Sequence, residues 1–209
     1  MSLFVTFEGP EGSGKTTIAN LLTDYLEKEG YEVVHTREPG GNVIAEQIRN
    51  IILDKKNTAM DPRTEALLFA ASRRQHLVEK VIPALKEGKI VICYRFIDSS
   101  LAYQGKGRNL GIDNIYNINL FATDGLLPDL TLLFDIEVEK GLERVFKDKD
   151  REVNRLDVAK VEFHKQVRDG YLEVAKKYPE RIKIIDASKS VEEVFNDTKD
   201  IILKCLKNI

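Results

Sequence analysis

The segment Gly9–Thr16 constrains the fold of this chain more than any other part of its sequence. Its residues, Gly-Pro-Glu-Gly-Ser-Gly-Lys-Thr, satisfy the pattern G-x-x-x-x-G-K-[ST] in full. The apolar run Leu3–Phe7 precedes it, and apolar residues at helical spacing follow it from Thr16 to Lys28. A strand, a glycine-rich loop and a helix in this order predict a P-loop, whose backbone N–H groups cradle phosphates. We therefore expect the chain to bind a nucleoside triphosphate.

The residue types of this loop suit that chemistry. Its glycines permit the backbone conformations that turn successive N–H groups inward, and the helix beginning near Lys15 adds the positive end of its dipole. Lys15 can reach the β- and γ-phosphates, and the Thr16 hydroxyl can ligate Mg²⁺. The expected triphosphate-binding residues are Gly9, Pro10, Glu11, Gly12, Ser13, Gly14, Lys15, Thr16 and Thr17.

Short apolar runs alternate with helical patterns along the rest of the chain. Strands are expected at Leu3–Phe7, Val33–His35, Ile90–Cys93, Leu130–Phe134 and Ile182–Ile185. Helices are expected at Thr16–Lys28, Val43–Leu53, Pro62–Lys86, where Pro83 could introduce a kink, and Val191–Leu206. Strands that are apolar along their whole length are typical of parallel sheets covered by helices on both faces. We therefore predict one α/β domain over residues 1–209, with a doubly wound five-stranded parallel sheet.

Composition excludes several classes of protein. The 209 residues are 43% hydrophobic and 32% charged, which is too apolar for a disordered chain and too charged for a membrane protein. The net charge of −2 argues against general nucleic-acid binding. No apolar run approaches a bilayer span, and the N-terminus lacks the basic start of a signal peptide. With Cys93 and Cys205 expected to stay reduced, we predict a cytoplasmic protein without nucleic-acid or membrane partners.

Three classes of P-loop protein compete: a GTPase switch, an ATP-driven motor and a small-molecule kinase. The Asn-Lys-x-Asp motif that reads guanine does not occur, and a motor's second nucleotide motif has only Leu132–Asp135 as a candidate. A kinase has positive support, because arginines can clamp a second anionic substrate. Phe69 lies one helical turn before Arg73, so both can face one pocket. Tyr103 and Gln104 supply a ring and an amide for a base.

Several blocks of this sequence resemble the signature blocks of bacterial thymidylate kinases. They are Phe7–Thr17, Thr36–Gly41 and Asp98–Gly105, with further similarity at Thr64–Arg74, Pro128–Thr131 and Arg155–Asp157. The resemblance covers nearly the whole chain, in the family's order and at its spacing. It implies a nucleoside monophosphate kinase-like P-loop fold that phosphorylates dTMP to dTDP with ATP and Mg²⁺, in dTTP biosynthesis. It also implies a homodimer whose small-molecule partners are dTMP and ATP.

The resemblance further implies a role for each residue of the dTMP site. Phe69 would stack on thymine, Arg73 and Gln104 would hydrogen-bond its edge, and Tyr103 would crowd the sugar 2′ position. Arg95, with Arg49, would clamp the acceptor phosphate. Near the sugar and the metal lie Glu11 and Glu38, and Glu38 could also hold Mg²⁺ through a water molecule beside Thr16. The full expected set is Glu11, Glu38, Arg49, Phe69, Arg73, Arg95, Ser99, Ser100, Tyr103 and Gln104.

The polar stretch from Arg144 to Arg155 corresponds to the lid that closes over ATP in the resembled family. By composition alone it is a solvated charged loop. The family carries a catalytic arginine either in the P-loop or in the lid, and Pro10–Ser13 contain no basic residue. The resemblance therefore implies a lid arginine, with Arg144 and Arg151 as candidates and Arg155 as a further one. The expected catalytic residues are Lys15, Arg95, Arg144 and Arg151.

Tyr94 departs from the family pattern, which normally places Asp before the phosphate-clamping arginine. Tyr94 cannot supply a carboxylate near Mg²⁺ or Lys15, and Glu8, just after the first apolar run, is the candidate for partial compensation. Two alternatives therefore stay open: a catalytically weak nucleotide-binding protein, and a kinase for another monophosphate such as dUMP. The second stays open because discriminating one methyl group is worth only about 1–3 kcal/mol. The three histidines are expected to serve packing or surface roles; they are His35, His76 and His164.

Overall fold

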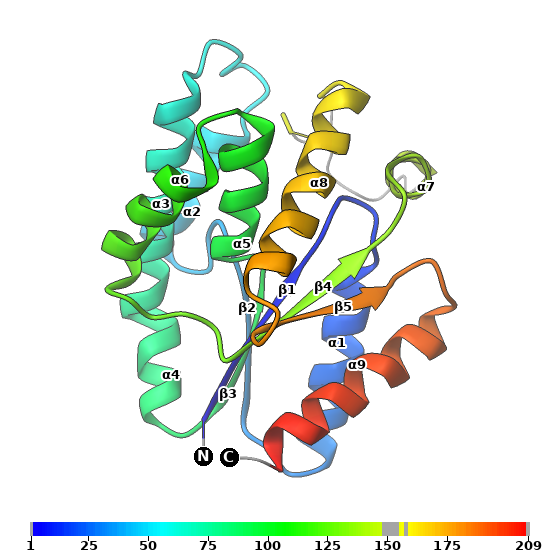
Figure 1. Ribbon diagram of the computed structural model, residues 1–209. Coiled ribbons are helices and arrows are strands. Elements are labelled where there is room, and N and C mark those ends of the chain that lie inside the picture. The colour runs from blue at the N-terminus through cyan, green and yellow to red at the C-terminus, as the bar shows by residue number, and fades with distance from the viewer. Residues whose placement is uncertain (1, 148–154, 157–158, 208–209) are drawn as a thin grey trace.

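The computed structural model describes residues 2–147, 155–156 and 159–207 (Figure 1). Five strands form one parallel sheet in the order β2-β3-β1-β4-β5. They are β1 (Leu3–Glu8), β2 (Val33–Arg37), β3 (Ile90–Tyr94), β4 (Leu130–Asp135) and β5 (Ile182–Asp186). The predicted five-stranded parallel sheet is confirmed. Each strand runs one or two residues further than its apolar run, because it ends in polar residues at the carboxyl edge.

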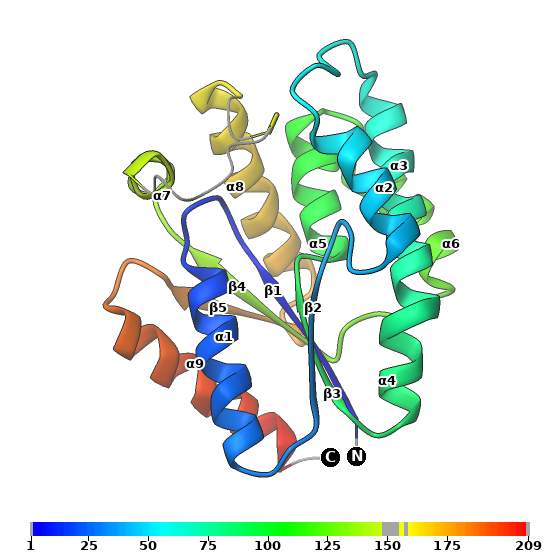
Figure 2. The same ribbon diagram turned by 180° about the vertical axis from the view of Figure 1, so that it is seen from behind.

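Helices cover both faces of the sheet (Figures 1 and 2). The α-helices of the described residues are α1 (Lys15–Lys28), α2 (Val43–Leu53), α3 (Pro62–His76), α4 (Ile82–Lys86), α5 (Ile97–Ser100), α6 (Ile112–Thr123), α7 (Val138–Lys147), α8 (Val161–Lys177) and α9 (Val191–Leu206). Two π-helical segments, η1 (Leu77–Val81) and η2 (Leu101–Gly107), continue α3 and α5. No described helix is long and apolar enough to cross a membrane.

Alternation along the strands divides the core into two layers. Leu3, Val5 and Phe7 of β1 are buried against the layer of α1 and α9, whereas Phe4 packs into the opposite layer. The opposite layer includes residues of η1, η2 and α8. Successive side chains of a strand point to opposite faces, so a strand covered on both sides must be apolar throughout. Full burial of one such side chain stabilises the fold by about 1.5–3 kcal/mol.

Side-chain caps fix where several helices begin. The Asn42 side chain accepts a hydrogen bond from the Ala45 N–H at 2.8 Å, and α2 begins at the next residue. Asp61 caps α3, whose first residue is Pro62. Ser190 and Glu193 form a capping box at the start of α9. Both α2 and α9 have the bounds that the sequence predicts.

The helix predicted over Pro62–Lys86 is divided by the π-helical turn η1 between α3 and α4. Pro83 has no N–H to donate within the helix, and a wider turn just before it accommodates that loss. The sequence analysis did not predict α5, η2, α6, α7 or α8. For α8 a signal was present, because Val167, Tyr171 and Val174 are buried at helical spacing. For α6 the buried Asn119 and Thr123 obscured the apolar pattern.

The strand order creates a switch point at the carboxyl edge of the sheet. β1 is flanked by β3 on one side and β4 on the other, so the chain turns in opposite directions from the centre. Ligands bind beside such a point in open α/β sheets. The loop that follows β1 lies here, near α7 and α8 in both views (Figures 1 and 2).

Candidate active site

A cavity of about 950 Å³ opens beyond the carboxyl ends of β1, β2 and β3. Its walls come from the loop after β1, the residues after β2 and β3, and the helices α2 and α3. All ten residues that the sequence analysis assigned to dTMP line this cavity, and Thr16 lines it too. The fold therefore gathers in one place side chains that are up to 93 positions apart, from Glu11 to Gln104.

Close backbone packing explains two glycines of the loop. Gly9 has φ 137° and Gly12 has φ 71°, which side chains rarely tolerate. A Cβ atom on Gly9 would overlap the Phe134 carbonyl of β4. A Cβ atom on Gly12 would overlap the backbone of Gly141, which shows how tightly α7 packs on the loop. The P-loop thus follows a path that only glycine permits at these points.

Lys15 lies inside this loop. Its side chain is 2% exposed, and its Nζ donates to Gly9 O at 3.0 Å, Pro10 O at 2.6 Å and Ser13 Oγ at 2.8 Å. These oxygens hold the ammonium group at the mouth of the loop, where phosphate oxygens could replace them. Thr16 and Thr17 follow it in the first turn of α1 with exposed side chains.

Arg95 directly follows β3 with φ 64°, a left-handed conformation that costs a residue other than glycine about 1–3 kcal/mol. Its Nη1 donates to Ser99 Oγ at 3.1 Å and to Tyr171 OH at 2.9 Å. Its Nη2 donates to Glu11 Oε1 at 2.5 Å and to Tyr103 OH at 3.2 Å. A strained backbone and these four polar contacts, from α5, α8, η2 and the P-loop, aim the guanidinium into the cavity, as an anion clamp requires.

Glu8 lies beneath this clamp, at the end of β1. Its Oε1 accepts from the N–H groups of Phe96 and Ser99 at 2.7 and 3.1 Å. Its Oε2 accepts from Ser99 Oγ at 2.5 Å and Tyr171 OH at 3.1 Å. Burial, together with the charge of Asp98, raises the pKa of Glu8 to about 7. Because Glu8 is 0% exposed and does not line the cavity, it does not supply the ligand-facing carboxylate that Tyr94 lacks.

We expect the Glu8→Gln variant to change how stability depends on pH. The folded-state pKa of Glu8, about 7, lies above the ordinary value of 4.5. The contribution of Glu8 to the free energy of unfolding is therefore fully present below pH 4.5 and is lost as the pH rises through 7. This loss amounts to about 3 kcal/mol. Glutamine does not titrate, so the free energy of unfolding of the variant minus that of the wild type should increase between pH 5 and pH 8. Urea unfolding at both values measures it, and a constant difference would contradict the pKa of Glu8.

One face of α3 contributes Phe69 and Arg73 to the cavity wall. Glu65, Phe69, Arg73 and His76 recur along it at helical spacing. Phe69 lines the cavity, and the buried Arg73 donates from Nε to Glu38 Oε2 at 2.7 Å. Arg73 Nη1 donates to Ser100 Oγ at 3.1 Å and to Asn119 Oδ1. These bonds fix the plane of the guanidinium and do not use its Nη2.

His76, for which the sequence analysis expected a packing or surface role, is buried in a hydrogen-bonded cluster beside Arg73. It is 0% exposed, and its Nδ1 lies 2.9 Å from Glu38 Oε1 while its Nε2 lies 2.7 Å from Thr36 Oγ1. Cys93 is also close enough to Glu38 and His76 to share a metal ion with them. Burial raises the pKa of the Cys93 thiol well above its usual range, and Arg73 already neutralises Glu38. The cluster therefore fits a hydrogen-bonded support for Arg73 better than a metal centre.

The Tyr94 ring lies close to two cations, Lys15 and Arg95. Its ring centroid is 5.5 Å from Lys15 Nζ and 5.5 Å from Arg95 Cζ. An aromatic face attracts both cations, where a carboxylate would have paired with them. Glu11, Glu38 and Glu46 line the same cavity as Thr16. Hydroxyl and carboxylate oxygens are ligands that Mg²⁺ accepts, so the donor set beside the P-loop fits this ion.

The candidate catalytic arginines of the lid do not share one location. Arg144, on α7, donates from Nη1 to Ala187 O at 3.2 Å and to Gly12 O at 3.5 Å, so it lies beside the P-loop. Arg151 lies outside the described residues. Arg155 donates from Nη2 to Glu65 Oε2 at 2.6 Å and from Nε to Ile52 O at 3.0 Å. Arg155 therefore joins α2 to α3.

Sequence reasoning missed several residues that hold the site residues in place. Glu65 contacts Gln104, Asn119 contacts Arg73, and Tyr171 contacts Arg95. Glu65 could have been noticed, since it is a lone carboxylate before the apolar stretch Ala66–Ala71. Nothing in the sequence pointed to Asn119, whereas Tyr171 belongs to the apolar spacing of α8, a helix that was not predicted.

Comparisons with known proteins agree with the resemblance. The family model described as thymidylate kinase matches residues 7–198. A thymidylate kinase of Clostridium novyi is 61% identical over 196 residues, which cover 94% of this chain and 96% of that protein. A thymidylate kinase of Bacillus licheniformis is 57% identical over 205 residues, which cover 98% and 97%. The crystal structure of thymidylate kinase from Ehrlichia chaffeensis is similar with a TM-score of 0.78 and 37% identity, covering 97% of this chain and 98% of that one.

Proposed function

The chain belongs to the thymidylate kinase family, and on that premise we propose which of its residues carry the reaction. The reaction is the ATP-dependent phosphorylation of dTMP to dTDP, which also yields ADP and is a step of dTTP biosynthesis. High identity over nearly the full length of named thymidylate kinases does not favour the two alternatives, a dUMP kinase and a catalytically weak nucleotide-binding protein.

The observation that supports the proposed roles most is the shared cavity. Phe69, Arg73, Arg95 and Thr16 all line it, and the Arg95 guanidinium reaches the P-loop at Glu11. A monophosphate whose base lies against Phe69 would direct its phosphate to Arg95, toward the P-loop. Phosphoryl transfer depends mainly on such positioning and on neutralisation of charge. We therefore assign Arg95, assisted by Arg49, to the acceptor phosphate of dTMP.

The remaining roles follow the chemistry of each group. Phe69 offers its ring to thymine, and Arg73 and Gln104 offer polar atoms to the edge of the base. Tyr103 is 4% exposed, and its bulk beside Glu11 leaves little room for a sugar 2′-hydroxyl. Ser99 and Ser100 support Arg95 and Arg73 from the cavity wall.

ATP and Mg²⁺ would occupy the P-loop end of the cavity. The backbone N–H groups of Gly9–Thr16 and the Lys15 ammonium group would hold the triphosphate. Thr16 would ligate Mg²⁺, and Glu38 would reach the ion through water. Bound Mg²⁺ neutralises charge on the phosphate oxygens.

A coupled assay of ADP release with dTMP, dUMP and dGMP tests this function. We expect turnover with dTMP, a lower kcat/KM with dUMP by about 10- to 200-fold because one methyl contact is lost, and none above background with dGMP. Equal rates with dTMP and dGMP, or ADP release that does not depend on dTMP, would contradict the proposal.

We expect Arg151→Ala to lower kcat with ATP and dTMP by about 10²–10³-fold, while the KM for dTMP changes little. A cation delivered when the lid closes would stabilise the transferring phosphoryl group and exclude water. Arg144→Ala is the comparison, since its guanidinium contacts the P-loop backbone. Steady-state kinetics separates the two, and an unchanged kcat in Arg151→Ala together with a reduced one in Arg144→Ala assigns the role to Arg144.

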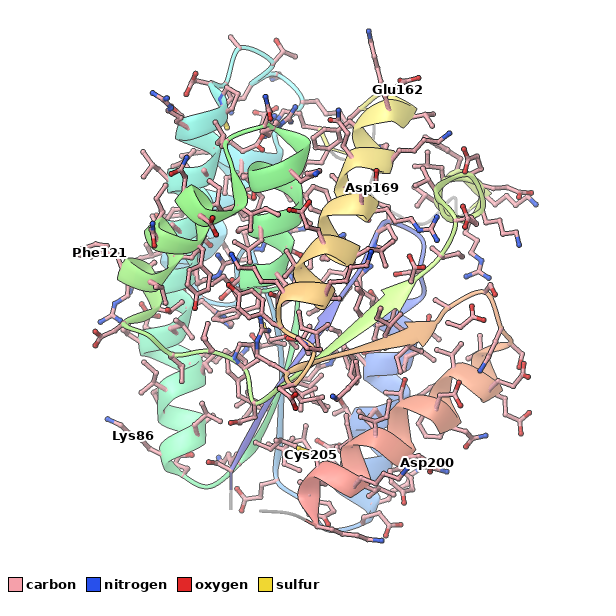
Figure 3. All side chains as sticks on the ribbon, in the orientation of Figure 1. Lys86, Phe121, Glu162, Asp169, Asp200 and Cys205 are labelled. Atoms are coloured by element: carbon pink, nitrogen blue, oxygen red, sulfur yellow. The ribbon has the colours of Figure 1, made fainter. Side chains whose placement is uncertain are left out.

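The homodimer is proposed from exposed apolar side chains on neighbouring helices. Ile44 and Ile51 on α2, Leu67 on α3 and Phe121 on α6 are all exposed, Phe121 by 92%. Phe121 extends outward from α6 (Figure 3). We expect light scattering to give twice the 23.8 kDa of one chain. The variant Leu67→Asp/Phe121→Asp should be monomeric, because two charges enter an apolar contact.

Ile184→Asp is the matched control for the dimer, since Ile184 is exposed on the edge strand β5. A dimer that survives both aspartates of Leu67→Asp/Phe121→Asp, or a wild-type monomer, would rule this face out. A cytoplasmic location is also proposed, because both described cysteines are free and both substrates are nucleotides.

A further inference from the structure

Glu65 is a buried carboxylate without a role in the reaction described above. It is 1% exposed and lies one turn before Phe69 on α3. Its Oε1 accepts from Gln104 Nε2 at 2.9 Å and from Arg108 Nε at 3.2 Å. Its Oε2 accepts from Arg108 Nη2 at 3.2 Å and from Arg155 Nη2 at 2.6 Å. Two guanidinium groups and one amide therefore converge on a single carboxylate.

These partners keep Glu65 ionised. Burial by itself would raise the pKa of Glu65, but the hydrogen bonds from Arg108, Gln104 and Arg155 lower it overall. An ionised carboxylate can only accept hydrogen bonds. The side-chain amide of Gln104 must therefore present its NH₂ group to Glu65, because the opposite orientation would set the Gln104 carbonyl oxygen against a carboxylate oxygen.

With its NH₂ group directed at Glu65, the Gln104 amide has its carbonyl oxygen, Oε1, as its other polar atom. Gln104 is 1% exposed and lines the cavity together with Phe69 and Arg73. Within residues 2–147, 155–156 and 159–207, no group donates a hydrogen bond to Gln104 Oε1. The polar atom that this amide keeps for a ligand is thus an acceptor. Arg73, beside it, can only donate.

We propose that Glu65 determines base specificity by holding the Gln104 amide in the orientation that accepts a hydrogen bond from the base. This inference rests on the proposed function, in which a base lies against Phe69. Thymine carries a donor at N3 and an acceptor at O4, so it suits the acceptor of Gln104 and the donors of Arg73. Cytosine carries an acceptor at N3 and an amino group at C4, so both contacts would fail. Glu65 is a positioning residue here, because it acts through Gln104.

The test compares dTMP with dCMP as phosphate acceptors in the Glu65→Gln variant. A neutral amide opposite Gln104 accepts either orientation of its partner, so the fixed acceptor is lost. We expect the ratio of kcat/KM for dTMP to that for dCMP to fall by about tenfold or more, with the KM for ATP unchanged. The ratio is measured on one preparation, so partial unfolding cancels. Glu65→Asp, which keeps the charge but withdraws the carboxylate from Gln104, is expected to lower the ratio as well.

Arg108→Gln is the matched control. Arg108 also contacts Glu65, but its removal leaves the bond between Glu65 and Gln104 in place, so the ratio should stay at the wild-type value. In a Gln104→Leu background, Glu65→Gln should cause no further change in the ratio, because the group through which it acts is gone. An unchanged ratio in Glu65→Gln and Glu65→Asp, or an equal fall in both backgrounds, would overturn the inference. Wild-type protein without dTMP-dependent ADP release would overturn the proposed function instead.

Discussion

Replacing Arg95 with alanine is expected to lower kcat/KM for dTMP by about 30- to 4,000-fold. Truncating one partner of a buried, hydrogen-bonded charge pair costs about 2–5 kcal/mol, and each 1.4 kcal/mol is tenfold. The loss here falls on the phosphate of dTMP, which would meet the carboxylates of Glu11 and Glu38 without the guanidinium that offsets their charge. Steady-state kinetics with dTMP varied at saturating ATP measures it.

Arg95→Lys is the matched comparison, because lysine keeps the charge and leaves the same backbone strain at this position. It loses the planar fork that a phosphate engages through two hydrogen bonds. We expect a smaller loss, about 10- to 100-fold, and a KM for ATP close to that of the wild type in both variants. A KM for dTMP that is unaltered in Arg95→Ala would show that Arg95 does not hold the acceptor phosphate.

Replacing Lys15 with methionine is expected to lower kcat by about 10³-fold, because removal of one preorganised charge-stabilising donor typically costs a factor of 10²–10³. Methionine retains the apolar stem that is buried in the loop, so the loop should still fold. Arg is not a substitute at this position. The Nζ atom lies 2.6–3.0 Å from three loop oxygens, and that space does not admit a guanidinium fork. We therefore expect Lys15→Arg to be nearly as slow as Lys15→Met.

Binding of dTMP without ATP is the control for Lys15, measured by calorimetry. Both variants should bind dTMP within about twofold of the wild type, because Phe69, Arg73 and Arg95 remain in place. A loss of dTMP affinity as large as the loss of kcat would point to collapse of the loop, and not to a missing charge on the transferring phosphoryl group.

Features that depend on residues close together in the sequence could be predicted from it. The P-loop is one continuous segment, and parallel strands bring their carboxyl ends to one edge. Residues after β1, β2 and β3 therefore had to meet. The ten residues assigned to dTMP do line one cavity. Their individual roles stay predictions, because lining a cavity does not identify what binds in it.

The supporting residues could not be predicted, because their contacts join distant positions. Tyr171 reaches Glu8 across 163 positions, and Asn119 reaches Arg73 across 46. Asn119 lies on α6, whose buried face includes polar residues that weaken the apolar periodicity typical of a helix. The sequence predicted only a packing or surface role for His76. Its contact with Glu38 becomes visible only in three dimensions.

Tyr94 shows how little one departure from a family's sequence pattern says about activity. The sequence revealed a missing carboxylate, which left a weak nucleotide-binding protein as an alternative. The structure shows a ring close to Lys15 and Arg95, with Glu11 and Glu38 in the cavity nearby. A named thymidylate kinase shares 61% of the aligned residues with this chain, which argues for the enzyme.

The most direct measurement of the central claim is a crystal structure of the protein with dTMP bound. Thymine should lie against the Phe69 ring with its edge toward Arg73 and Gln104, and the phosphate should contact Arg95, where Glu11 now lies at 2.5 Å. A base bound elsewhere, or a phosphate that leaves the Arg95–Glu11 pair intact, would contradict it.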